Sequence, residues 1–117
     1  MYTRNSEIIV KNESISLPID SISRIDVANG KTGDFVLLEN EDTYNEILKV
    51  IQENKYIPKQ EEEGWTIGIR IYSGGKHYWF TPTGLSGYNY ENPNLFKELL
   101  LIISDEIKID FVESYLN

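Results

Sequence analysis

Cysteine is absent from this chain of 117 residues, and histidine occurs once, as His77. Without cysteine the protein has no disulfide framework and no thiolate zinc site, and a single histidine excludes a histidine-rich metal site. We therefore expect no metal ion and no cofactor. The lack of cysteine also fits a reducing compartment, where disulfides are rare.

Long apolar runs are also missing. The longest, at residues 99–103, has five residues, whereas a membrane-spanning helix needs about 20. Residues 1–7 contain no apolar stretch of the kind found in a signal peptide. We therefore expect no membrane span and, as the chain stands, a cytoplasmic protein. Removal of a leader would instead place it outside the cytoplasm.

Positive charge is scarce, because 11 Lys and Arg residues stand against 19 Asp and Glu residues, for a net charge of −8. Contact with a nucleic-acid backbone needs a surplus of Lys and Arg on some face of the protein. We therefore expect no direct nucleic-acid binding. An acidic protein instead attracts basic surfaces, so the composition favours a protein partner with a basic surface.

The order of the expected elements predicts the fold class. Apolar periodicity and turn residues predict strands at 7–10, 15–19, 21–27, 35–38, 65–72 and 76–80, a strand or ordered loop at 85–90, and helices at 41–53, 92–107 and 111–116. This order predicts one α+β domain over residues 1–117, with an antiparallel sheet of hairpins and a three-strand meander covered on one side by two helices. The alternative is a pleckstrin-homology-like barrel, whose strand series the helix at 41–53 would interrupt.

The helix at 41–53 has the clearest signal. Residues 43–46, Thr-Tyr-Asn-Glu, have the form of a capping box, and apolar side chains recur at Tyr44, Ile47, Leu48 and Ile51. Asn54 follows the last of these positions, and a proline comes soon afterwards. We therefore expect the helix to stop near Asn54.

Two glycine-containing segments predict hairpins. A two-residue turn at Gly74-Gly75 would pair residues 69–73 with residues 76–80. In this register Tyr78 and Phe80 face the core, while Arg70, Tyr72, His77 and Trp79 share the opposite face. A two-residue turn at Asn29-Gly30 would set apolar residues against polar ones, so we expect a longer loop there, extending through Gly33.

No segment carries a catalytic signature. Residues 74–79, Gly-Gly-Lys-His-Tyr-Trp, lack the spacing of a phosphate-binding loop and join two strands, whereas such a loop opens a helix. His77 has no evident orienting partner, so we expect no catalytic residue and no enzymatic activity. The three glutamates at 61–63 lack the spacing of a calcium loop and predict a solvated, charged loop at 59–64. A hydrolase that uses scattered carboxylates remains an alternative.

The candidate binding residues are aromatic side chains and one arginine. Arg70, Tyr72 and Trp79 occupy the polar face of the meander, and Tyr88 and Tyr90 lie in the adjoining segment. Arg, Tyr and Trp are the residue types enriched at binding hot spots. We therefore expect a non-enzymatic, acidic protein-binding module, such as an inhibitor or immunity-type factor.

A loose pattern connects several of these segments. It comprises Ile-Ser-Arg-Ile at 22–25, Asn-Gly-Lys-Thr-Gly at 29–33, Gly-Trp at 64–65 and Ile-Arg-Ile-Tyr at 69–72. Over about residues 20–103 the chain resembles small, largely uncharacterised domains of low-GC Gram-positive bacteria, often found behind a lipoprotein leader. The resemblance implies a fold more than an activity, and this chain lacks the lipid-bearing cysteine. It suggests an alternative function, an extracytoplasmic accessory domain that binds a small ligand or cell-wall component through Tyr72, Trp79, Tyr88 and Tyr90.

Overall fold

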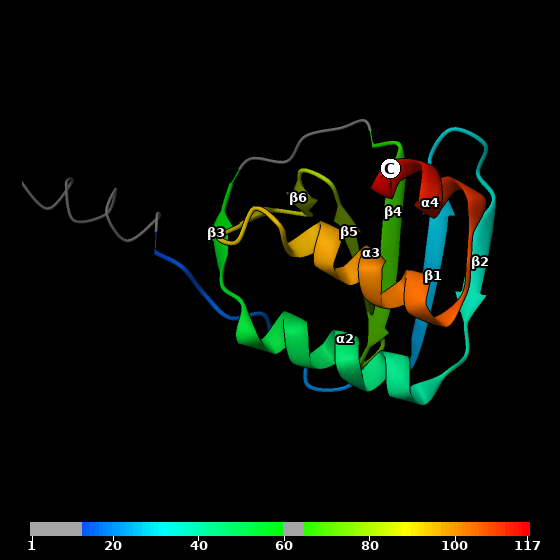
Figure 1. Ribbon diagram of the computed structural model, residues 1–117. Coiled ribbons are helices and arrows are strands. Elements are labelled where there is room, and N and C mark those ends of the chain that lie inside the picture. Colours follow the sequence, from blue (N-terminus) through cyan, green and yellow to red (C-terminus); the bar gives the residue numbers. More distant parts are fainter. Residues whose placement is uncertain (1–12, 60–64) are drawn as a thin grey trace, which may run out of the picture.

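The computed structural model describes residues 13–59 and 65–117, which form a seven-stranded antiparallel sheet with three helices (Figure 1). The expected strand at 7–10 and most of the charged loop at 59–64 lie outside the described residues. The elements are β1 (Arg24–Asn29), β2 (Phe35–Leu38), α2 (Glu41–Glu53), β3 (Tyr56–Pro58), β4 (Ile67–Ser73), β5 (Lys76–Thr81), β6 (Gly84–Leu85), β7 (Tyr88–Tyr90), α3 (Leu95–Glu106) and α4 (Asp110–Leu116). The predicted α+β class is confirmed.

The sheet has the strand order β2-β1-β4-β5-β6-β7-β3. All three helices lie against one of its faces (Figure 1), so α4 joins α2 and α3 in covering the predicted side. The core fills the space between the two layers. Its largest fully buried side chains are Tyr56, Phe80, Ile25, Leu38, Ile47, Ile51, Ile69, Ile71, Leu95, Leu99, Leu100 and Ile103.

The β4–β5 hairpin has the predicted register. Arg70 pairs with Trp79 and Ile69 with Phe80. The turn works because Gly74 and Gly75 adopt φ angles of 58° and 79°, a region that glycine enters readily because it has no Cβ. Phe80 is fully buried and Tyr78 packs against the core, as the register requires.

The β1–β2 connection is the longer loop that the sequence predicts. Val27 pairs with Val36, which places the turn well beyond Asn29. The loop closes because Gly33, with a φ of 83°, donates its N–H to the Asn29 carbonyl over 2.8 Å. The pairs Ile25–Leu38 and Val27–Val36 therefore match apolar side chains on the core face.

Helix α2 ends where expected but begins differently. The N-cap is Asn40, whose side-chain oxygen accepts a hydrogen bond from the Asp42 N–H at 2.8 Å. The capping box predicted for residues 43–46 is therefore wrong, because Thr43 lies inside the helix and is buried. Asn40 provides the cap one turn earlier and leaves Thr43 free to pack.

Helix α3 begins at Leu95, three residues later than the helix expected at 92–107. Asn92 accepts hydrogen bonds from the next residues instead, its side chain from the Asn94 N–H at 3.0 Å and its carbonyl from the Leu95 N–H at 3.1 Å. A residue before proline avoids helical backbone, and this turn occupies the intervening positions.

The strand expected at 15–19 is reduced to one bridge, and a strand that periodicity missed takes its place. Ile15 and Tyr56 exchange two backbone hydrogen bonds of 2.8 Å. The ladder does not continue through Pro18, which has no N–H to donate. Tyr56 itself begins β3, which pairs with β7. A three-residue strand is too short for an alternating pattern to reveal it.

Candidate binding face

One face of the sheet points away from the helices, and we call it the open face. Because cross-strand partners point to the same side, the register assigns to it Phe35, Leu37, Arg24, Asp26, Ala28, Gly68, Arg70, Tyr72, His77 and Trp79. The core residues occupy the alternate positions of the same strands. The predicted binding residues Arg70, Tyr72 and Trp79 are therefore brought together, as expected from the hairpin register.

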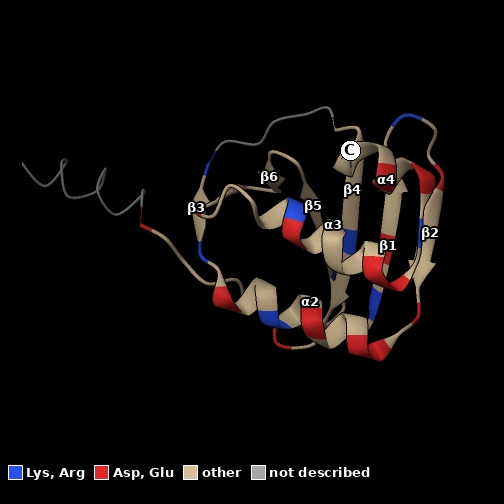
Figure 2. Ribbon diagram, in the orientation of Figure 1, with Lys and Arg blue, Asp and Glu red and all other residues tan. Residues whose placement is uncertain are grey.

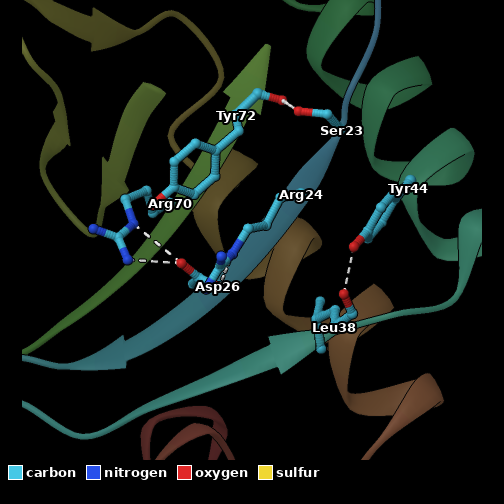
Figure 3. Close-up of polar contacts among 7 residues, drawn as sticks. All are labelled: Ser23, Arg24, Asp26, Leu38, Tyr44, Arg70 and Tyr72. Atoms are coloured by element: carbon cyan, nitrogen blue, oxygen red, sulfur yellow. Dashed lines mark hydrogen bonds and ion pairs between the residues drawn. The ribbon is translucent and has the colours of Figure 1, made fainter. Parts of the chain in front are cut away.

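A fully buried carboxylate lies at the centre of the open face. Asp26 has no exposed surface, and Arg24 and Arg70 bind it from the two sides (Figure 3). The Arg24 Nε lies 3.0 Å from one carboxylate oxygen, and the Arg70 Nη2 lies 2.7 Å from the other. A buried charge is tolerated only when it is paired and hydrogen-bonded. The hydrogen bond to Asp26 also raises the pKa of the Arg24 guanidinium, because it favours the charged form.

Aromatic rings surround these arginines. The Arg70 guanidinium carbon lies 5.1 Å from the ring centre of Tyr72 and 5.0 Å from that of Trp79. Arg70 therefore forms cation–π contacts with both rings. The Arg24 guanidinium carbon lies 5.4 Å from the centre of the same Tyr72 ring. The exposed ring of His77 also packs against Tyr72, with 5.8 Å between the two ring centres. His77 thus contributes a packing contact to this face.

Trp65 is a member of the open face that sequence reasoning missed. Its ring lies 5.1 Å from that of Trp79, with 32° between their planes. Alternation continued back from Ile67 would place Trp65 on the core side, but β4 begins only at Ile67 and the pleat does not constrain the residues before it. The available signal was Gly68, where an added Cβ would stand 3.1 Å from Trp79 and 3.2 Å from Trp65. Glycine lets both rings lie directly over the backbone.

Tyr88 and Tyr90 lie on the other side of the sheet. Tyr90 is buried, stacks on Phe80 at 6.2 Å, and donates its hydroxyl to the carbonyl oxygens of Thr81 and Gly84 at 2.6 and 3.1 Å. Tyr88 is half-buried and packs against the same core. Burial raises the pKa of Tyr90 well above its ordinary value. The structure therefore separates these two rings from Arg70, Tyr72 and Trp79, because β7 joins the sheet and its alternate residues follow the pleat.

The helices and the open face differ in their charged residues. Acidic residues outnumber basic ones on the three helices (Figure 2), while Arg24 belongs to β1 and Arg70 to β4. Within residues 13–59 and 65–117, no group of three or more His, Cys, Asp or Glu side chains could hold a metal ion. In the same described ranges, no helix is both long and apolar enough to cross a membrane.

Comparison with known protein families, curated proteins and solved structures finds no significant match to this chain. Function must therefore be argued from the open face and its chemistry.

Proposed function

We propose that this protein is a non-enzymatic protein-binding module that docks a partner on the open face. One observation carries the proposal: Trp65, Trp79, Tyr72 and Arg70 form a contiguous cluster on the side of the sheet that the helices leave uncovered. Tryptophan, tyrosine and arginine are the residue types that dominate the energetics of protein interfaces.

The cluster is ordered before any partner arrives. Asp26 binds both Nε and Nη2 of Arg70, and the Tyr72 and Trp79 rings confine the same guanidinium. An immobilised long side chain costs roughly 0.5–1.5 kcal/mol when an interface forms. Because the fold has already restricted Arg70, less of this cost remains for binding.

The expected partner combines a basic surface with a central acceptor. The net charge of −8 attracts basic proteins and accelerates their association. At the centre of the open face, however, the exposed charges belong to Arg24 and Arg70, with side-chain exposures of 44% and 26%. A partner that fits both features presents lysine and arginine around a carboxylate or carbonyl group. An inhibitor or immunity-type factor that blocks a basic surface is the function we propose.

The test compares Trp79→Ala and Tyr72→Ala with a control, Leu101→Ala, which removes an exposed side chain from α3. A partner is captured with the unaltered protein, and its affinity for each variant is measured by calorimetry at low and high salt. Loss of a hot-spot residue is expected to weaken binding by about tenfold or more, while Leu101→Ala leaves affinity unchanged. High salt should weaken association further, because it screens the acidic surface. Equal affinities for Trp79→Ala, Tyr72→Ala and the unaltered protein would refute the aromatic anchor.

The accessory-domain alternative has less support from the geometry. It requires one surface built from Tyr72, Trp79, Tyr88 and Tyr90, but Tyr90 is enclosed in the core on the opposite side of the sheet.

A further inference from the structure

The two edges of the sheet differ in how they are protected. At the β3 edge, Ile15 pairs with Tyr56 through two backbone hydrogen bonds, and Pro58 has no N–H to offer. The other edge is β2, the first strand in the sheet order. Edge strands in native proteins are normally blunted by proline, lysine, bulges or covering segments. The β2 sequence, Phe-Val-Leu-Leu, contains none of the blunting residues.

The unpaired backbone groups of β2 belong to Phe35 and Leu37. Asn29 donates its N–H to the Asp34 carbonyl at 2.7 Å, and hydrogen-bonded pairs alternate along an antiparallel ladder. Val36 and Leu38 therefore turn their N–H and C=O groups toward β1, and Phe35 and Leu37 turn theirs outward. Among the described segments, none outside the β1–β2 pair supplies a backbone hydrogen bond to either residue.

The same two residues expose large apolar side chains. Phe35 is 56% exposed and Leu37 is 41% exposed. Both point to the open face, next to Ala28 and Asp26 of β1. Free backbone groups and apolar side chains at alternate positions are the two features by which a sheet edge recognises an extended peptide.

We propose that β2 is a strand-addition site for an extended segment of the partner, with apolar side chains at alternate positions and lysine or arginine at both ends. Acidic residues at both ends of β2 favour a peptide with basic ends. Asp34 and Glu39 flank β2, and neither forms an ion pair with any described residue. Two further acids, Glu41 and Asp42, open helix α2 just beyond. This inference rests on the proposed function, because the added strand would extend the open face.

A second copy of the chain fits this edge poorly. A two-fold pairing of β2 with itself would bring Asp34 of one copy close to Glu39 of the other. It would also join two molecules that each carry a net charge of −8. Like charges facing each other across strands destabilise the pair.

The experiment uses a synthetic peptide of about nine residues, long enough for one strand, with valine at alternate positions between lysine pairs. Its binding is followed by NMR titration and by exchange of backbone amide hydrogens. We expect the N–H groups of Phe35 and Leu37 to become protected. An analogue methylated at the edge-facing peptide nitrogens keeps its side chains but cannot form the ladder, so it should bind at least about tenfold more weakly.

Matched protein variants separate the edge from general charge effects. Leu37→Lys places a blunting lysine on the edge, and Leu101→Lys makes the same change at a leucine on α3 that is 48% exposed. Peptide affinity should fall at least about tenfold for Leu37→Lys and stay unchanged for Leu101→Lys.

Several results would overturn strand addition. They are equal affinity for the methylated analogue, equal loss in both lysine variants, no binding of the parent peptide up to about millimolar concentration, and a dimer that protects Phe35 and Leu37 without peptide. A titration that perturbs the Trp65 and Trp79 indoles but not β2 also rejects the edge site while leaving docking on the open face intact. The proposed function is tested separately, and it fails if the partner binds Trp79→Ala as tightly as it binds the unaltered protein.

Discussion

Asp26 shows at the residue scale how a polar face can be ordered without being covered. Its carboxylate is fully buried between Arg24 and Arg70, whereas both arginines keep part of their surface in solvent. The charge is neutralised locally, and the Tyr72 ring packs against both guanidinium groups. The exposed charge that remains on this face is therefore cationic, although the whole protein is acidic.

Replacing Asp26 by Asn tests this arrangement. Asparagine keeps the shape but removes the charge, leaving Arg24 and Arg70 close together without their anion. We expect the free energy of unfolding to fall by about 1–3 kcal/mol, less than for a fully enclosed pair because both arginines reach water. Urea denaturation measures the change. The control Asp20→Asn alters an exposed carboxylate and should change stability by less than about 0.5 kcal/mol; equal effects would contradict a structural role for Asp26.

At the scale of elements, helix α2 is attached at its first turn. Asn40 caps the helix, and the Tyr44 hydroxyl donates a hydrogen bond to the Leu38 carbonyl of β2 (Figure 3). Ile47 and Ile51 are buried one and two turns further on. The Tyr44 hydrogen bond thus connects the first turn of α2 to the end of β2, and the apolar stripe packs the rest of the helix into the core.

The position of the cap can be tested with two asparagines of the same segment. Asn40→Ala removes the acceptor for the Asp42 N–H and should lower the free energy of unfolding by about 1 kcal/mol. Asn45→Ala changes an exposed position inside the helix, where alanine has the better helix propensity, so stability should stay the same or rise. Thermal denaturation of both variants distinguishes them. A loss for Asn45→Ala as large as for Asn40→Ala would show that the cap lies elsewhere.

At the scale of the whole molecule, the ionisation of three tyrosines makes the stability of the fold depend on pH. Burial raises the pKa of Tyr44, Tyr56 and Tyr90 above the ordinary value. In the unfolded chain tyrosine ionises near pH ~10. Above that pH the unfolded state binds fewer protons than the folded state, so stability is complete below it and declines as pH rises toward the folded-state pKa values.

Alkaline denaturation should therefore begin above pH ~10, with each buried tyrosine contributing a slope of about 1.4 kcal/mol per pH unit. The measurement is the urea midpoint over a pH series. Tyr90→Phe removes one buried hydroxyl and should reduce the slope, whatever its effect on stability at neutral pH. Leu101→Ala changes an exposed side chain that does not ionise and should leave the slope unaltered. The same slope in Tyr90→Phe and in the unaltered protein would show that ionisation of Tyr90 does not cause the loss of stability.

The sequence by itself determined the β4–β5 hairpin and helix α2, because both depend on residues that are close together in the chain. Gly74-Gly75 set the register of the β4–β5 hairpin, because a two-residue turn with positive φ permits only one alignment of its strands. The apolar spacing in 41–53 specified α2 in the same way. From the hairpin register the sequence predicted that Arg70 and Trp79 would meet on the polar face.

Tertiary structure decided which other rings join them. Tyr90 enters the core because β7 pairs with β3, a contact between segments that no local pattern relates. Trp65 reaches the open face because it lies outside β4 and finds bare backbone at Gly68. Periodicity describes a side chain's direction only within a continuous strand, whereas packing between distant segments decides where each strand begins and which strand lies beside it.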